Sequence, residues 1–250
     1  MSKKNYTHIG IVLDRSGSMA SMKKDVIGGF NTFIEEQNKV EGEATITFAQ
    51  FDTQYDLLQD FTKLSNVPVL TDHVFQPRGS TALLDAMGKS LTDVRSKVKT
   101  MDEEERPEKV IFVFITDGEE NASHEYNKDR VFKMIEDLRD EEEINWEFVF
   151  IGANQDAIQA GNGLGVRQGR SINYDASGAG TQVMFASLTS GMNNYRSKGL
   201  HEVSSADYSF FDSTADKKDD FLKNPKGPLQ NMYVDSTRKT RSSKKNKDTK

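Results

Sequence analysis

The sequence predicts an α/β fold, namely a Rossmann-like, doubly wound and mostly parallel six-stranded sheet with one antiparallel edge strand and helices on both faces. Short apolar runs alternate with longer amphipathic stretches, which is the pattern of a parallel sheet wrapped by helices. Several runs are apolar throughout, as expected for strands that are buried on both faces. One pair of runs is separated only by a short turn, which permits only an antiparallel hairpin.

Six segments are expected as strands. The run 110–115 (VIFVFI) is the most apolar of them, so we place it at the sheet centre. The run 55–61 follows its predecessor after a turn at Asp52-Thr53, so it is expected as the antiparallel edge strand. The predicted strands are 8–13, 44–51, 55–61, 110–115, 146–151 and 170–174.

Five segments carry apolar residues at helical spacing. The clearest is 81–98, in which the apolar side chains recur every three or four residues and share one side. The first predicted helix is followed by Gly42 as a stop signal. The predicted helices are 19–39, 81–98, 126–142, 154–163 and 181–198.

The chain is expected to hold one domain over residues 1–200 and a polar C-terminal extension over 201–250. The last residues, 237–250, include seven Lys or Arg and one Asp, so they carry +6 while the rest of the chain carries −12. This composition predicts disorder after about residue 225. The acidic body argues against general nucleic-acid binding, and only the basic tail is suited to contact nucleic acid or an acidic surface.

Composition also excludes several classes of site. The chain has no cysteine, which rules out a disulfide framework, a zinc–thiolate site and a thiol nucleophile. No stretch approaches the ~20 apolar residues of a membrane helix, so no membrane contact is expected. The polar start, 1–7, lacks the apolar run of a secretory signal. A cytoplasmic location is therefore expected.

Two predicted strands end in aspartate where the chain turns, at Asp14 and Asp117. Ligands of doubly wound sheets bind beyond the carboxyl ends of the strands, which places both carboxylates well for chemistry. Ser16 and Ser18 follow Asp14 directly, and Gly17 between them allows a tight turn. Carboxylate and hydroxyl oxygens suit a hard cation such as Mg²⁺.

The segment Asp14-Arg15-Ser16-Gly17-Ser18 resembles the D-x-S-x-S motif of von Willebrand factor A domains, which opens their metal-ion-dependent adhesion site. The family also has a threonine on a loop before a helix and an aspartate after a central strand. The segments 78–83 (RGSTAL) and 115–118 (ITDG) resemble these two loops, with Thr81 and Asp117 at the matching positions. The resemblance covers roughly residues 6–200.

The resemblance implies that Ser16, Ser18 and Thr81 contact a divalent cation directly, while Asp14 and Asp117 act mostly through bound water. The ion would be Mg²⁺, with Mn²⁺ or Ca²⁺ as alternatives. Its open position would accept an Asp or Glu carboxylate from a protein partner, so the implied function is binding and not catalysis.

The strings TDGEENAS (116–123) and FIGANQDAI (150–158) resemble small stand-alone members of the family in bacteria and phages. Such relatives act beside ATPases, in stress systems or in phage particles, and these settings come from the resemblance alone. A structural or assembly component that uses the fold as a scaffold is the alternative function.

Other interpretations of the same residues stay open from sequence. Asp14 resembles the nucleophile of a haloacid-dehalogenase-like phosphatase, but those enzymes need a second aspartate where Ser16 stands. The hydroxyls and carboxylate of the motif are also suitable helix caps. The acidic run after Asp117, residues 119–121, either extends the metal site or forms a solvated loop.

Overall fold

A computed structural model describes residues 2–153, 156–205 and 208–211. The described residues belong to one compact unit. The segment after residue 225, which the sequence predicts to be disordered, and the basic tail 237–250 lie outside these residues.

The structure contains the predicted six-stranded mixed sheet, with strand order β3-β2-β1-β4-β5-β6. Only β3 runs antiparallel, against β2 at one edge, and the other neighbouring strands are parallel. The strands are β1 (Lys3–Asp14), β2 (Glu43–Phe51), β3 (Tyr55–Lys63), β4 (Pro107–Thr116), β5 (Asn145–Ala153) and β6 (Ser171–Tyr174).

The strand order reverses between β1 and β4. The chain first builds outward from β1 to β2 and β3, and then returns to place β4 on the other side of β1. In a doubly wound sheet this switch point opens a crevice beyond the carboxyl ends of the two central strands. Asp14 ends β1 there, and Asp117 directly follows β4.

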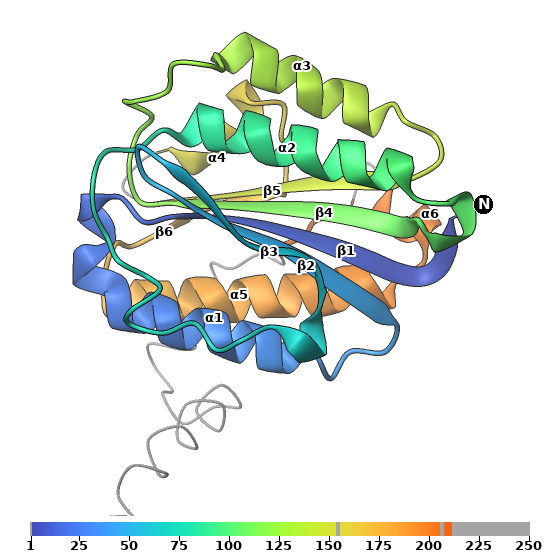
Figure 1. The fold of residues 1–250 in the computed structure, drawn as a ribbon, viewed down its shortest axis with the longest axis horizontal. Coiled ribbons are helices and arrows are strands. Elements are labelled where there is room, and N and C mark those ends of the chain that lie inside the picture. The colour runs from blue at the N-terminus through green and yellow to red at the C-terminus, as the bar shows by residue number, and fades with distance from the viewer. Residues whose placement is uncertain (1, 154–155, 206–207, 212–250) are drawn as a thin grey trace, which may run out of the picture. The chain divides into compact units, whose positions relative to one another are not determined.

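Helices cover both faces of the sheet, and Figure 1 shows α2, α3 and α4 on one side with α1 and α5 side by side on the other. The helices are α1 (Lys23–Gln37), α2 (Leu83–Thr100), α3 (Lys128–Arg139), α4 (Ala157–Gly163), α5 (Gly178–Ser197) and the short α6 (Leu200–Val203). Among the described residues, no helix is long and apolar enough to cross a membrane.

Each face of the sheet has its own hydrophobic core. Alternate residues of β1 point to opposite sides, so Ile9, Ile11 and Leu13 pack toward α1 and α5, whereas Val12 packs toward α2 and α3. The central strand β4 supplies both cores, and its apolar residues from Val110 to Ile115 are fully buried. The continuous apolar run of this strand follows from burial on both faces.

Several elements begin or end a few residues from their predicted limits. The strand β1 starts at Lys3, well before the predicted 8–13, because the Lys3 amide donates to the Arg106 carbonyl even though its side chain is exposed. Asn5 in this extension has a φ of 56°, where the pairing with β4 shifts register. The predicted helix 19–39 is a 3₁₀ turn (Gly17–Met22) followed by α1.

Described residues beyond 200 also contribute to the core beneath α5. Val203, Tyr208, Phe210 and Phe211 are buried against the same cluster as α1 and α5. Arg170, itself buried, donates to the carbonyl of Tyr208 and forms an ion pair with Glu147 at 3.1 Å. These contacts anchor the chain after α6 to the end of the sheet that carries β5 and β6.

Candidate metal centre

Three loops meet at the carboxyl ends of β1 and β4. The first, 14–18, leads from β1 into the 3₁₀ turn, the second, 78–81, precedes α2, and the third, 116–121, follows β4. The first two loops are joined through their backbones, because the Gly17 amide donates to the Gly79 carbonyl at 3.2 Å. The switch point of the sheet therefore brings together segments that are far apart in the sequence.

Asp14 is completely buried at the floor of this site. One of its oxygens accepts a hydrogen bond from the Ser16 amide at 2.6 Å, and the other accepts from the Thr116 hydroxyl at 2.6 Å. The carboxylate thus ties the end of β1 to the end of β4. Both donors are neutral, so these hydrogen bonds do not balance the charge.

A chain of hydrogen bonds continues from Ser16 to the third loop. The Ser16 and Ser18 hydroxyls are 3.0 Å apart, and the Ser18 hydroxyl donates to Asp117 at 2.6 Å. Ser16 and Asp117 are buried, whereas Ser18 is exposed, which leaves the site open to solvent on the side of Ser18.

Thr81 is buried and lies close to the same loop. Its amide donates to the Asn121 side chain at 3.0 Å, and its carbonyl accepts from the Asn121 amide at 3.1 Å. A Cβ on Gly118 would stand 3.3 Å from the Thr81 hydroxyl and 3.9 Å from the Ser18 hydroxyl. The structure therefore gathers all five residues singled out from the sequence: Asp14, Ser16, Ser18, Thr81 and Asp117.

The two carboxylates carry shifted pKa values. Burial raises the pKa of Asp14 to about 6, and the negative charge of Asp117 adds to the shift, although hydrogen bonds from Thr116 and Ser16 oppose it. Burial also raises the pKa of Asp117 against the hydrogen bond from Ser18. Neither carboxylate forms an ion pair with a cationic side chain among the described residues, so their negative charge is uncompensated.

The donor set fits a hard divalent cation, because every side-chain group is a carboxylate or hydroxyl oxygen. Within the described part of the chain, no group of three or more His, Cys, Asp or Glu side chains gathers as a metal cage, so any cation here would depend on hydroxyls and water. Helix capping does not account for the motif, since Ser16 precedes the 3₁₀ turn without a side-chain cap bond and the N-cap residue of α1 is Met22.

The acidic run after Asp117 is not a freely solvated loop. Glu120 accepts hydrogen bonds from the amides of Leu84, Ala122 and Ser123 at 2.7–2.9 Å. It therefore satisfies an amide in the first turn of α2 and orders its own loop. Glu119 in the same run has an exposed side chain.

Asp52 is a structural residue of the site, although the sequence predicts only a turn at this position. It is 1% exposed and accepts hydrogen bonds from Arg15 at 3.0 Å and Arg78 at 2.8 Å. Arg15 belongs to the first loop and Arg78 to the second. One available signal is that Asp52, like Asp14 and Asp117, follows the end of an apolar strand.

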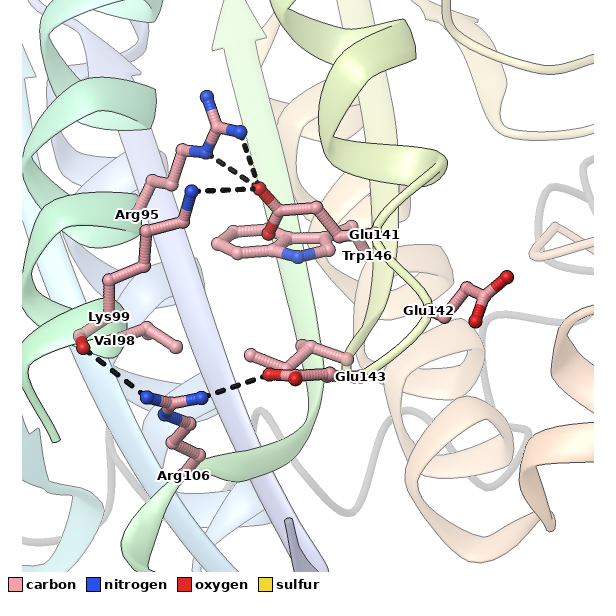
Figure 2. A pocket seen from close by; sticks show the side chains of 9 residues that line it. Arg95, Val98, Lys99, Arg106, Glu141, Glu142, Glu143 and Trp146 are labelled. Carbon is pink, nitrogen blue, oxygen red and sulfur yellow. Dashed lines mark hydrogen bonds and ion pairs between the residues drawn. The ribbon is translucent and has the colours of Figure 1, made fainter. Parts of the chain in front are cut away.

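A cavity of about 260 Å³ lies elsewhere, at the amino ends of β4 and β5. Figure 2 shows that basic side chains lining the cavity form ion pairs with acidic side chains of the same lining: Arg95 and Lys99 contact Glu141, and Arg106 contacts Glu143. In doubly wound sheets ligands bind at the opposite, carboxyl edge, and none of the five predicted site residues lines this cavity.

The fold and the site together define a doubly wound α/β domain with an oxygen-rich centre at its switch point. The family model for the von Willebrand factor type A domain matches residues 8–165, so the chain belongs to this family. No curated protein matches the sequence.

Solved structures support the fold. Two crystal forms of proximal thread matrix protein 1 from the mussel byssus are similar, with TM-scores of 0.51 and 0.52 at 15% and 16% identity. The matches cover 74% and 76% of this chain but only 45% and 46% of the mussel protein. This chain therefore spans about half the length of the structures it matches, and the likeness concerns the fold alone.

Proposed function

We propose that the site binds one divalent cation and presents it to an Asp or Glu carboxylate of a protein partner. Ser16, Ser18 and Thr81 supply direct ligands, with Asp14 and Asp117 at or behind them. The observation that carries the proposal is the meeting of two uncompensated, largely buried carboxylates with hydroxyls from separate loops.

The electrostatics of the site favour a cation that stays incompletely neutralised. Two nearby carboxylates repel each other unless a positive charge stands between them. Burial is the main cause of the raised pKa values of Asp14 and Asp117, and the charge of Asp117 adds to the shift of Asp14. A cation whose nearest protein ligands are neutral hydroxyls keeps much of its charge. It therefore attracts an outside carboxylate, and Mg²⁺ or Mn²⁺ suits such a site.

We propose a binding module and not an enzyme. A serine nucleophile needs a base that accepts its proton, but the Ser18 hydroxyl donates to Asp117, whose ionised form the cation would hold in place. A phosphatase of the haloacid-dehalogenase kind would need an acid at the position of Ser16. The partner is a protein with an exposed carboxylate, for which an ATPase or a stress-system or virion component is the candidate.

Titration calorimetry with Mn²⁺ tests the metal site. Wild type should bind one ion with modest affinity, because few charged ligands surround it and the ion keeps bound water. Asp14→Ala should lose this binding while its circular dichroism stays that of a folded protein. Asp60→Ala is the matched control, because this carboxylate is half-exposed on β3 and pairs with Lys97 away from the site.

A pull-down from the native host tests partner recognition. Partner capture should require Mg²⁺, should disappear with a chelator, and should be weaker for Thr81→Ala although that variant folds. Equal Mn²⁺ binding by wild type and Asp14→Ala would refute the metal site. Capture that is independent of metal would favour the scaffold interpretation instead.

A further inference from the structure

The two loops that supply the hydroxyls of the site each carry an arginine that binds the same buried carboxylate, that of Asp52. The Nε atoms of Arg15 and Arg78 donate to the same oxygen of Asp52, at 3.0 and 2.8 Å. Arg15 is itself buried and also contacts Asp56 at 2.7 Å, whereas the Arg78 side chain is 54% exposed. The Asp52 carboxylate therefore joins the loop of Ser16 and Ser18 to the loop of Thr81.

The backbone at the end of β2 contacts the same two loops. The Arg15 amide donates to the Phe51 carbonyl at 2.8 Å, and the Ala82 amide donates to the Asp52 carbonyl at 3.0 Å. The loops also contact each other, since the Arg78 amide donates to the Arg15 carbonyl at 2.8 Å. The Asp52 side chain thus adds to a junction between the two loops that backbone hydrogen bonds also hold. These backbone hydrogen bonds would remain after substitution of Asp52.

We propose that Asp52 is a positioning residue of the metal centre, holding the first loop and the Thr81 loop in the relative arrangement that the cation requires. The metal part of this inference rests on the proposed function, whereas the coupling of the two loops does not. Asp52 would not touch the cation, and its effect would pass through Arg15 and Arg78.

The chemistry of the junction suits this role. The ligands of the cation come from separate segments, so any freedom between the loops must be lost when the ion binds. A buried carboxylate between two guanidinium groups makes short, charge-assisted hydrogen bonds that restrict such freedom. Burial opposes ionisation of Asp52, but hydrogen bonds from Arg78 and Gln54 and the charge of Arg15 outweigh it and hold its pKa below the ordinary value.

The first test compares Mn²⁺ affinity among three variants. Asp52→Asn should weaken binding about tenfold, as the loss of groups that orient metal ligands does, and Arg78→Met should weaken it by a smaller factor. Arg95→Met is the matched control, because Arg95 also pairs with a carboxylate through Nε, at 2.7 Å from Glu141, but lies at the other edge of the sheet (Figure 2). The control should bind Mn²⁺ as wild type does.

The second test uses the metal-free protein. Hydrogen exchange of the Gly17 amide, which donates to the Gly79 carbonyl between the loops, should become about fivefold faster in Asp52→Asn and in Arg78→Met, which corresponds to about 1 kcal/mol of lost local protection. Arg95→Met should leave this rate unchanged. A general loss of stability would instead accelerate exchange in the central strands as well.

These outcomes separate positioning from a purely structural role. Wild-type Mn²⁺ affinity together with unchanged Gly17 exchange in a folded Asp52→Asn protein would overturn the proposal. If that variant does not fold, Arg78→Met decides, because its side chain is more than half exposed and leaves the Arg15 pair intact. If wild type itself fails to bind Mn²⁺, the proposed function falls, and Gly17 exchange alone decides whether Asp52 couples the loops.

Discussion

Asp14 is a single buried carboxylate that makes the stability of the metal-free protein depend on pH. Its pKa is raised to about 6 in the folded protein, above the ordinary value of 3.8, mainly by burial. The folded state therefore holds the proton more tightly than the unfolded state does. Stability from this group is present at low pH and is lost as pH rises from about 4 through 6.

Asp14→Asn should consequently stabilise the metal-free protein at pH 7.5. The neutral amide avoids the cost of a buried charge, and the shift of about two pKa units corresponds to a gain of up to about 3 kcal/mol. Urea denaturation in a chelator measures it. The gain should shrink at pH 4.5, where wild-type Asp14 is already protonated, and a variant that is less stable than wild type at both pH values would contradict this account.

His8 produces a pH dependence of the opposite sign. It is fully buried on β1, stacks on Phe61 with ring centroids 3.7 Å apart, and contacts the Thr45 hydroxyl through Nδ1 at 2.8 Å. Burial, and secondarily the charge of Lys97, lowers its pKa from 6.5 to about 3. The unfolded state therefore binds the proton more readily, and stability is lost as pH falls below 6.5.

Between pH 7 and 4.5 this histidine should cost wild type about 2–3 kcal/mol of unfolding free energy. His8→Phe keeps a flat ring against Phe61 but cannot titrate, so the difference in stability between variant and wild type should change by that amount over the same interval. Urea denaturation of both proteins across this pH range measures this change. Taking the difference between the two proteins cancels the contribution of Asp14, which both contain. Parallel pH profiles would show that His8 does not titrate as inferred.

At the scale of elements, buried basic side chains bind the backbone carbonyls at the ends of α1 and α5, the two helices on one face of the sheet. Arg196 of α5 donates to the carbonyls of Gln37 at 2.6 Å and of Val40 and Gly42 at 3.4 Å, beyond the end of α1. Lys109 of β4 in turn donates to carbonyls at the end of α5, including Tyr195 at 3.2 Å. Positive charge at these ends satisfies free carbonyls and complements the helix dipoles.

Lys109→Met should therefore destabilise the protein by about 2–4 kcal/mol, because it leaves buried carbonyls without their charged donor. The control is Lys133→Met, which removes an exposed pair with Asp137 on α3 and should cost less than about 0.5 kcal/mol. Urea denaturation compares the two. Equal losses would mean that the contacts of Lys109 contribute no more than a surface ion pair.

The amino-acid sequence predicts the helices and strands well wherever burial dictates residue type. The central strand β4 is a continuous apolar run because both its faces are covered, and the edge position of β3 follows from its short connection to β2. Element limits were less predictable. The polar start of β1 pairs with its neighbour through backbone hydrogen bonds. Neither the periodicity nor the composition of a segment indicates such pairing, so the start of this strand could not be predicted.

The sequence also predicts that the site residues lie together, because the carboxyl ends of parallel strands share one edge of the sheet. Asp14 and Asp117 come together for that reason, and the loops that follow carry Ser16 and Ser18 with them. Its place after a strand marks Asp52 as a candidate, but the partners of Asp52 and Glu120 could not be predicted. Each depends on hydrogen bonds between loops that are distant in sequence, and the spacing of residues along the chain does not specify such pairs.

For the whole molecule, the extent of the folded unit can be tested by truncation. The polar composition after residue 200 places the domain boundary there, whereas the compact unit of the structure runs to residue 212. The described residues between these limits include four buried apolar side chains, Val203, Tyr208, Phe210 and Phe211. Burial and hydrogen bonding, and not sequence position, decide whether a terminal segment can be removed.

A chain that ends at residue 212 should unfold in urea with a free energy within about 1 kcal/mol of the full chain, because the removed residues are mostly polar and charged and offer few apolar side chains to bury. A chain that ends at Gly199 should lose at least about 5 kcal/mol, at roughly 1.5–3 kcal/mol for each large apolar side chain removed from the core. It would also leave Arg170 without its carbonyl partner at Tyr208. Since such a loss equals the total stability of many domains, the shorter chain should be largely unfolded by circular dichroism. Equal stability of the two truncated chains would show that the segment packed beneath α5 contributes nothing to folding and that the domain ends near residue 200.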